Sequence, residues 1–196
     1  MIVGIDEAGR GPLAGIVVGC ALHLKKRPPF VVRDSKELSP QARESFIPWL
    51  WKNACFCVNV ATPRQIDKLN ILEATFLTFN RAIKGLLTKQ PSLSKATFIV
   101  DGNLFRTNLN IKYICISKAD KKVKEVSCAS IVAKVVRDYF MKLADFLYPE
   151  WNFSRHKGYP TAEHVSLLEK YPPTPFHRRS FSPCKKEESY ELQEKV

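Results

Sequence analysis

Residues 2–12 read Ile-Val-Gly-Ile-Asp-Glu-Ala-Gly-Arg-Gly-Pro, and the interpretation of the whole chain starts from this stretch. An apolar run leads directly into two adjacent acids, Asp6 and Glu7, and then into the turn Gly9-Arg10-Gly11. Consecutive apolar residues are typical of a strand that is covered on both faces. Glycine lets the backbone of a turn approach a neighbouring group closely. The stretch therefore predicts a central strand that ends in two negative charges. The turn after it has a backbone that another group can approach closely.

Strands and helices alternate along the rest of the chain. Strands are expected at residues 1–6, 15–24, 54–61, 97–101 and 113–116. Helices are expected from Pro40 to about Trp51, from Thr62 to about Ile83, and from Val126 to Leu147, where apolar residues recur at helical spacing. This alternation predicts an α/β domain with a mixed five-stranded sheet flanked by helices.

The composition changes after Pro149, where prolines become frequent and leave room only for short helices. We therefore expect a main domain at residues 1–148 and a small helical C-terminal extension at residues 149–186. Residues 187–196 are polar and rich in glutamate, which predicts a flexible tail.

The overall composition limits the class of protein. The 196 residues include 31 Lys and Arg against 19 Asp and Glu, a formal net charge of +12 that favours a polyanionic partner such as nucleic acid. No apolar stretch approaches the roughly 20 residues that span a bilayer, and the sequence begins directly on a strand, so we expect neither a membrane segment nor a signal peptide. Six cysteines without a Cys-x-x-Cys pair predict reduced thiols in a cytoplasmic protein and do not support a zinc site.

Acids stand at positions that would bring them together. Asp6 and Asp101 each follow an apolar run, and parallel neighbouring strands about 4.8 Å apart would carry both to the same edge of the sheet. Glu7 adds a donor from the turn, and Asp138 lies on the core-leaning stripe of the last long helix. Converging carboxylates repel one another, and Mg²⁺ or Mn²⁺ relieves that repulsion. Two such ions about 3.5–4 Å apart would polarise a phosphodiester, so the acids predict a metal-dependent phosphoryl-transfer site.

Each acid also has a simpler interpretation. An Asp after a strand, such as Asp101, is often a turn former or a helix cap. Asp138 follows Arg137 directly and would be explained by a surface ion pair between the two. The pair Asp6-Glu7 is compatible with ordinary loop chemistry. Spacing alone therefore leaves both the metal site and these structural roles open.

The sequence motifs resemble those of the type 2 ribonucleases H, specifically bacterial ribonuclease HII. The matching segments are I-D-E-A-G-R-G-P-L-A-G (residues 5–15), Asp34-Ser35-Lys36, Asn70-Ile71-Leu72-Glu73-Ala74-Thr75, Val100-Asp101-Gly102-Asn103, residues 129–138, residues 156–161 and residues 177–181. They occur in order and extend from residue 2 to about residue 183.

The resemblance implies a ribonuclease H-like fold and cleavage of the RNA strand of RNA–DNA hybrids, including single ribonucleotides embedded in duplex DNA. It implies two-metal hydrolysis with Mg²⁺ or Mn²⁺, 5′ to the ribonucleotide, leaving 3′-hydroxyl and 5′-phosphate ends. The metal-binding and catalytic acids would be Asp6, Glu7, Asp101 and Asp138. The implied roles are RNA primer removal and ribonucleotide excision repair.

The resemblance also implies the residues that contact the substrate. These are Gly9, Arg10, Gly11, Ser35, Lys36, Asn70, Lys157 and Tyr159. A glycine turn can approach a sugar closely, and the 2′-hydroxyl distinguishes RNA from DNA. The expected partners are RNA–DNA hybrids and ribonucleotide-containing duplexes. We expect a monomer whose C-terminal extension packs on the substrate side, and the tail shows no clear clamp-binding motif.

One departure and several alternatives remain. Where related sequences carry Lys-Gly-Asp, this chain has Lys118-Ala119-Asp120, and alanine would add strain if that position has a positive φ. The related ribonuclease HIII is disfavoured because it carries an extra N-terminal domain and a Glu at the position of Asp138. Two other hypotheses are a DNA nuclease or resolvase on the same fold, and a hybrid-binding module without catalysis.

Overall fold

The computed structural model describes residues 1–29 and 38–184, so Ser35, Lys36 and the expected tail at 187–196 lie outside the described residues. The strands are β1 (Ile2–Ala8), β2 (Val17–Leu24), β3 (Ala54–Ala61), β4 (Thr97–Asp101) and β5 (Lys112–Ile116). The helices are α1 (Pro40–Asn53), α2 (Pro63–Leu69), α3 (Ile71–Lys89), α4 (Lys124–Leu147), α5 (Phe153–His156) and α6 (Ala162–Lys170). Short 3₁₀ helices are η1 (Pro91–Lys95), η2 (Ala119–Lys121) and η3 (Pro149–Trp151).

The five strands form one mixed sheet in the order β3-β2-β1-β4-β5, which confirms the predicted α/β architecture. β1 pairs in parallel with β4 and antiparallel with β2, so it lies at the centre of the sheet. The parallel register sets Ile5 opposite Val100, and therefore the next residues, Asp6 and Asp101, lie side by side at the end of the pairing between the two strands. The prediction that these two strands are parallel neighbours is confirmed.

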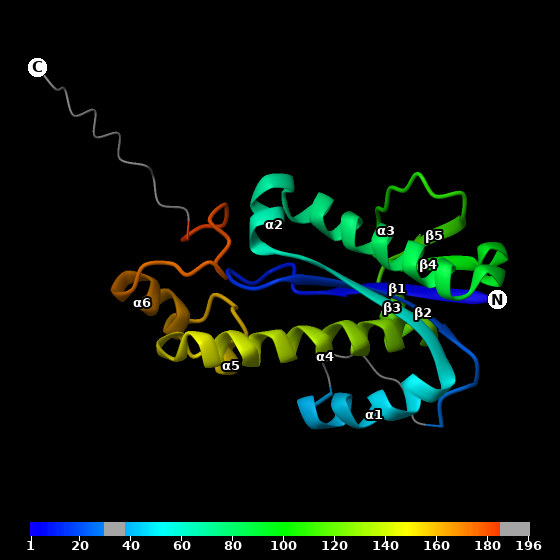
Figure 1. The fold of residues 1–196 in the computed structure, drawn as a ribbon, viewed down its shortest axis with the longest axis horizontal. Helices are drawn as coiled ribbons and strands as arrows, with labels where there is room; N and C mark the ends of the chain where they lie inside the picture. Colours follow the sequence, from blue (N-terminus) through cyan, green and yellow to red (C-terminus); the bar gives the residue numbers. More distant parts are fainter. Residues whose placement is uncertain (30–37, 185–196) are drawn as a thin grey trace, which may run out of the picture.

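Helices cover both faces of this sheet (Figure 1). On one face, α3 packs Phe76 and Phe79 against Ile5 and Phe98. On the other face, α4 packs against Val18 and other residues of β2, and α1 lies outside α4. This two-sided burial explains why the strands read as continuous apolar runs and not as alternating patterns.

The helix expected from Thr62 to Ile83 is two helices, which corrects the prediction. α2 begins with a capping box in which Thr62 and Gln65 satisfy each other's backbone amides. At Asn70 the backbone turns to φ 68°, which breaks the helical path. The Asn70 side chain then accepts hydrogen bonds from the amides of Leu72 and Glu73 and caps α3. The apolar spacing continues through this break, so periodicity alone joins the two helices.

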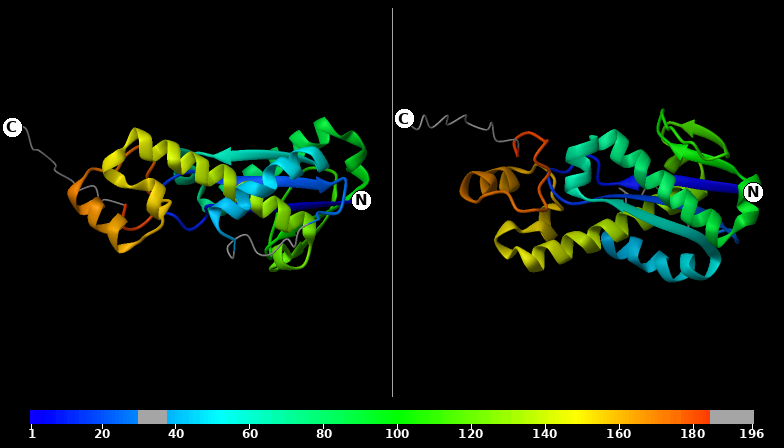
Figure 2. Two further views of the ribbon diagram at one scale, coloured as in Figure 1. Left: turned by 90° about the horizontal axis from the view of Figure 1, so that it is seen from below. Right: turned by 45° about the horizontal axis from the view of Figure 1, so that its top comes forward.

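The segment after α4 folds back onto the end of β1. Figures 1 and 2 show this C-terminal segment, η3 to residue 184, at the end of the molecule opposite the N-terminus. Its Trp151 and Phe153 stack on each other and pack with Ala14 and Met141. The main chain of Gly158 accepts a hydrogen bond from Leu13, and Gly15 donates to Phe176. These contacts join the segment to the loop that follows β1.

Two general predictions concern the surroundings of the protein. All six cysteines lie in the described part of the chain and are free, as expected for reduced thiols. Among the helices of the described residues, none is long and apolar enough to cross a membrane.

Candidate active site

Three predicted acids meet in one pocket at the edge where β1 and β4 end. Asp6 and Glu7 both come from β1 and Asp101 from β4. Because β1 extends to Ala8, Glu7 lies in the strand and not in the turn where the sequence placed it. The same pocket is lined by the turn Gly9-Arg10-Gly11 and by Tyr159 of the C-terminal segment. The parallel pairing of β1 with β4 brings the acids together, and the C-terminal segment folds back to place Tyr159 beside them. The pocket therefore combines negative charge, a glycine-rich turn and an aromatic ring.

Asp6 lies in an environment that disfavours its charged form. Its side chain is buried, and its pKa lies well above the usual range, first because of burial and then because of the negative charges of Glu7 and Asp101. One of its oxygens accepts a hydrogen bond from the Glu7 amide at 2.7 Å. Glu7 lies 3.7 Å from Arg10, which balances part of the charge.

Asp101 combines a place in the pocket with a contact to the loop before α4. Its Oδ1 accepts a hydrogen bond of 2.6 Å from the amide of Ala119, at the start of η2. Asp101 therefore also has the structural role that the sequence left open, because it fixes the backbone at the start of η2. The carboxylate still lines the pocket beside Asp6 and Glu7.

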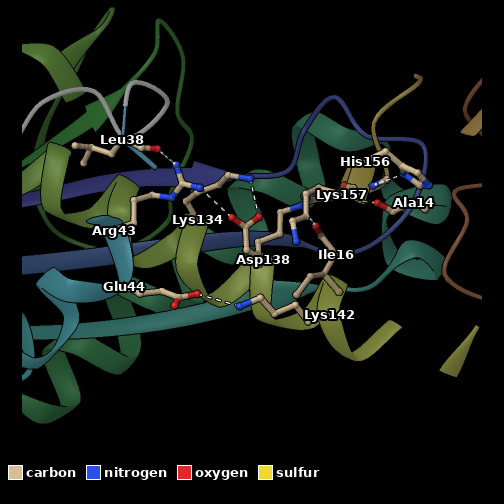
Figure 3. A network of polar contacts seen from close by, with 12 residues as sticks. Ala14, Ile16, Leu38, Arg43, Glu44, Lys134, Asp138, Lys142, His156 and Lys157 are labelled. Carbon is tan, nitrogen blue, oxygen red and sulfur yellow. Dashed lines mark hydrogen bonds and ion pairs between the residues drawn. The ribbon is translucent and has the colours of Figure 1, made fainter. Parts of the chain in front are cut away.

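Asp138 lies on α4 between two cationic side chains (Figure 3). Arg43 of α1 approaches its Oδ2 at 3.2 Å, and Lys134 approaches its Oδ1 at 2.7 Å. Asp138 and Arg43 are buried, and Lys134 is nearly so. Arg137 does not pair with Asp138 and donates its hydrogen bonds to backbone carbonyls. The alternative of a surface ion pair between Asp138 and Arg137 is therefore wrong.

Asp138 is not among the residues that line the pocket, whereas Lys134 is. Among the described residues, no group of three or more His, Cys, Asp or Glu side chains is arranged as a ready-made metal cluster. The donor chemistry nevertheless fits a hard divalent cation, because Asp6, Glu7 and Asp101 offer only oxygen and repel one another without a cation.

Comparison with known proteins gives the family. A family model described as ribonuclease HII matches residues 3–184, which is most of the chain. The chain belongs to the ribonuclease HII family. It is a metal-dependent endoribonuclease that cleaves the RNA of RNA–DNA hybrids. Membership favours this activity over a DNA nuclease and over a module without catalysis, and it agrees with the preference for HII over HIII.

Curated relatives support the same family. Ribonuclease HII of Chromobacterium violaceum is 42% identical over 186 residues, which cover 94% of this chain and 91% of the relative. Ribonuclease HII of Hydrogenovibrio crunogenus is 44% identical over 187 residues, which cover 94% of this chain and 86% of the relative.

Solved structures support the fold. The ribonuclease H2 of Pyrococcus horikoshii superposes with a TM-score of 0.73 at 25% identity, covering 94% of this chain and 95% of that chain. A ribonuclease HIII crystallised with Mn²⁺ gives a TM-score of 0.71 at 20% identity, covering 94% of this chain and 68% of that chain. The fold of this ribonuclease HII chain is therefore ribonuclease H-like, as predicted.

Two further predicted substrate residues within the described part of the chain, Asn70 and Lys157, are not gathered at the pocket. The Asn70 side chain caps α3, and the carbonyl of Lys157 accepts a hydrogen bond from Arg137. Neither residue lines the pocket that holds the acids. The Lys157 pKa is lowered, chiefly by burial. Asn70 and Lys157 stay predicted contacts with the nucleic acid.

Three polar pocket residues of this ribonuclease HII were not predicted from the sequence: Asp120, Ser130 and Lys134. Ser130, Lys134 and Asp138 are spaced four residues apart on α4, so their common helix face was a usable signal. Asp120 had no such signal, because it follows the irregular turn at Lys118. The positive φ in that turn belongs to Lys118, at 57°, so the expected strain at Ala119 is absent.

Proposed function

We propose that Asp6, Glu7, Asp101 and Asp138 hold two divalent ions, Mg²⁺ or Mn²⁺, and that the enzyme hydrolyses the phosphodiester 5′ to a ribonucleotide. The products would carry 3′-hydroxyl and 5′-phosphate ends. The observation that supports this most is the meeting of two acids from β1 and one from β4 in one pocket. When bound, the ions would activate water and stabilise the leaving oxygen.

Asp138 has a particular part in this proposal. Each of its oxygens already has a cationic partner, Arg43 or Lys134. The charge of Asp138 is therefore balanced without a metal ion. To bind an ion, a carboxylate oxygen of Asp138 would have to give up Arg43 or Lys134, or contact the ion in addition to them. Lys134 lines the pocket and is also placed to meet the scissile phosphate. The two cations would thus keep a buried acid stable until ions and substrate arrive.

The turn and the aromatic ring would recognise the substrate. Gly11 is exposed and carries no side chain, so a sugar can approach its backbone. Tyr159 is 42% exposed and lines the same pocket, which suits stacking on a sugar or base. Because the 2′-hydroxyl separates RNA from DNA at a single nucleotide, this pair would select single ribonucleotides in duplex DNA.

Further substrate contacts would come from Ser35, Lys36, Asn70 and Lys157, acting on the phosphates of the duplex. The C-terminal segment would be a substrate-side extension of the domain, since it supplies Tyr159 to the pocket. One chain contributes all of the proposed catalytic acids, which supports a monomeric enzyme. The biological roles that suit these substrates are RNA primer removal and ribonucleotide excision repair.

A cleavage assay tests the proposal. The substrates are two identical duplexes, one with a single ribonucleotide and one of DNA only, each incubated with Mg²⁺, Mn²⁺ or a chelator. We expect metal-dependent cutting of the first duplex alone, on the 5′ side of the ribonucleotide. Equal cutting of both duplexes would support a DNA nuclease, and tight binding without product would support a binding module.

The variant Asp101→Asn sharpens this assay. Asparagine keeps an oxygen that accepts the Ala119 hydrogen bond, so the loop stays in place while the charge is lost. We expect hybrid binding to persist and cleavage in Mg²⁺ to fall by about a hundredfold or more. The matched control is Glu44→Gln, which removes an exposed acid paired with Lys142. Unchanged turnover in Asp101→Asn would exclude Asp101 from the site.

A further inference from the structure

Two arginines lie directly beneath the recognition turn without a carboxylate partner. Arg137 comes from α4 and Arg178 from the C-terminal segment, and both side chains are 0% exposed. Within residues 1–29 and 38–184, neither forms an ion pair with an acid. A buried guanidinium without a counterion is costly unless other groups satisfy it. Here backbone carbonyls do so.

Arg178 binds the loop from one side. Its Nη2 donates to the carbonyl of Gly9 at 2.6 Å, and its Nη1 donates to the carbonyl of Arg10 at 2.9 Å. Its Nε donates to the carbonyl of Gly15 at 3.0 Å. One planar guanidinium thus reaches both ends of the loop between β1 and β2, a geometry that the single point charge of lysine cannot reproduce.

Arg137 binds the C-terminal part of the same loop. Its Nε donates to the carbonyl of Ile16 at 3.2 Å, and its Nη2 donates to Ala14 at 3.1 Å and to Lys157 at 2.9 Å. Figure 3 shows Ala14, Ile16 and Lys157 gathered at this point. The contact requires glycine at position 9, because a Cβ there would lie 2.3 Å from the Arg137 Nε.

Arg137 also connects the turn to the aromatic ring. Its guanidinium carbon lies 5.7 Å from the centre of the Tyr159 ring. Its Nη1 is buried and has no hydrogen-bond partner in the described part of the chain, so the contact with the ring is a further interaction of a guanidinium that is not fully hydrogen-bonded. The turn and Tyr159 therefore share one rigid support.

The direction of these bonds decides which groups of the turn face the pocket. The carbonyls of Gly9 and Arg10 point inward to Arg178. The amides of Arg10 and Gly11 donate no backbone hydrogen bond to any described residue, and both residues are exposed at the pocket. With its acceptors turned inward, the turn presents donors to the substrate, and a donor suits a hydroxyl oxygen.

We propose that Arg178 and Arg137 are positioning residues that determine specificity: Arg178 holds the carbonyls of Gly9 and Arg10 inward and so aims the amides of the turn at the 2′-hydroxyl of the substrate, and Arg137 supports the turn by packing against Gly9 and holding the carbonyls of Ala14 and Ile16. The inference deepens the proposed function and rests on the recognition role of the turn. The carbonyls also hold two positive charges close together, and burial together with Arg137 lowers the pKa of Arg178 to about 9. Removing the Arg178 guanidinium would free the carbonyls of Gly9 and Arg10 to turn outward, and removing the Arg137 guanidinium would loosen the loop beside them, so in either case the amides would no longer be aimed at the pocket.

The test measures discrimination between two duplexes that differ in a single 2′-hydroxyl. Dissociation constants are measured by fluorescence anisotropy with Ca²⁺ in place of Mg²⁺, and Arg178→Lys is compared with the parent chain. We expect the preference for the ribonucleotide duplex to fall about tenfold, the value of one lost hydrogen bond. Mn²⁺ affinity, measured by calorimetric titration, should stay within about threefold of the parent value.

The matched control is Arg155→Lys in the same segment, whose side chain is 79% exposed and pairs with Glu163. It should leave the preference unchanged. A second variant, Arg137→Lys, tests the other guanidinium in case Arg178→Lys does not fold. A folded variant that keeps the full preference overturns the inference, and so does failure of both variants to fold, because the arginines would then serve stability alone. If the parent chain itself shows no preference, the recognition role of the turn fails first.

Discussion

Replacing Gly4 with alanine would push α4 away from the sheet. Gly4 lies in β1, and a Cβ built there would be 2.2 Å from the carbonyl carbon of Glu125 and 2.2 Å from the amide nitrogen of Val126. Both atoms belong to backbone, so no side-chain rotation relieves the overlap. Ordinary contact begins at 3.4 Å, so the helix must move by the difference between 3.4 and 2.2, which is 1.2 Å.

This displacement sets the expected magnitude. Overpacking a core costs up to about 3 kcal/mol, and an overlap with backbone belongs at the upper end of that range. For a chain of this size, that loss corresponds to a fall in melting temperature of about 6–12 °C. Because α4 carries Lys134 and Asp138, a shift of about 1 Å should also reduce kcat about a hundredfold.

Thermal unfolding followed by circular dichroism measures the effect. The matched control is Gly11→Ala, where the nearest atom to the new Cβ is a Tyr159 ring carbon at 3.9 Å and the stability should change by less than about 0.5 kcal/mol. A melting temperature of Gly4→Ala within about 2 °C of the parent would refute the reasoning. That result would mean that α4 can move away from β1 with little loss of stability.

Two further predictions concern buried charge. Burial lowers the pKa of His164 to about 4 and that of His177 to about 3, from 6.5, so the unfolded chain binds more protons below pH 6.5. Their stabilising effect is complete above pH 6.5 and is lost progressively as the pH falls toward 4. Because each histidine loses about 2 kcal/mol between pH 7 and pH 5, the free energies of urea unfolding at these two pH values should differ by about 4 kcal/mol, and a flat profile would contradict this. Arg43→Met leaves Asp138 with Lys134 alone, so stability should fall by about 3 kcal/mol while Mn²⁺ binds several-fold more tightly in a calorimetric titration. Weaker Mn²⁺ binding would show that Arg43 does not compete with the ions.

The sequence was sufficient to predict which acids meet at the ends of the parallel strands. It was not sufficient to predict which cationic side chains lie around them. Asp6 and Asp101 were found because each follows a continuous apolar run, and parallel pairing of such runs is a strong regularity. The environment of Asp138 was not found, because its partner Arg43 lies 95 residues away in the chain. A contact of that kind depends on how α1 packs against α4, and local periodicity contains no information about it.

The same limit applies to the break at Asn70 and to the pocket lining. A positive φ at a single asparagine interrupts a helix without interrupting its apolar spacing, so α2 and α3 appear as one helix in the sequence. Asp120 reaches the pocket through the irregular turn before α4. Its position follows from backbone dihedral angles that residue type does not fix.

The support of the turn also has a consequence for how the enzyme is made. The guanidinium that holds the carbonyl of Gly9, that of Arg178, is synthesised 169 residues after it. A nascent chain contains the four proposed catalytic acids by residue 138 but cannot complete the support of the turn until residue 178 has left the ribosome. Chain fragments that end before Arg178 would therefore carry the acids without the guanidinium that holds the carbonyls of Gly9 and Arg10. In the order of synthesis, the proposed selectivity comes after the catalytic acids.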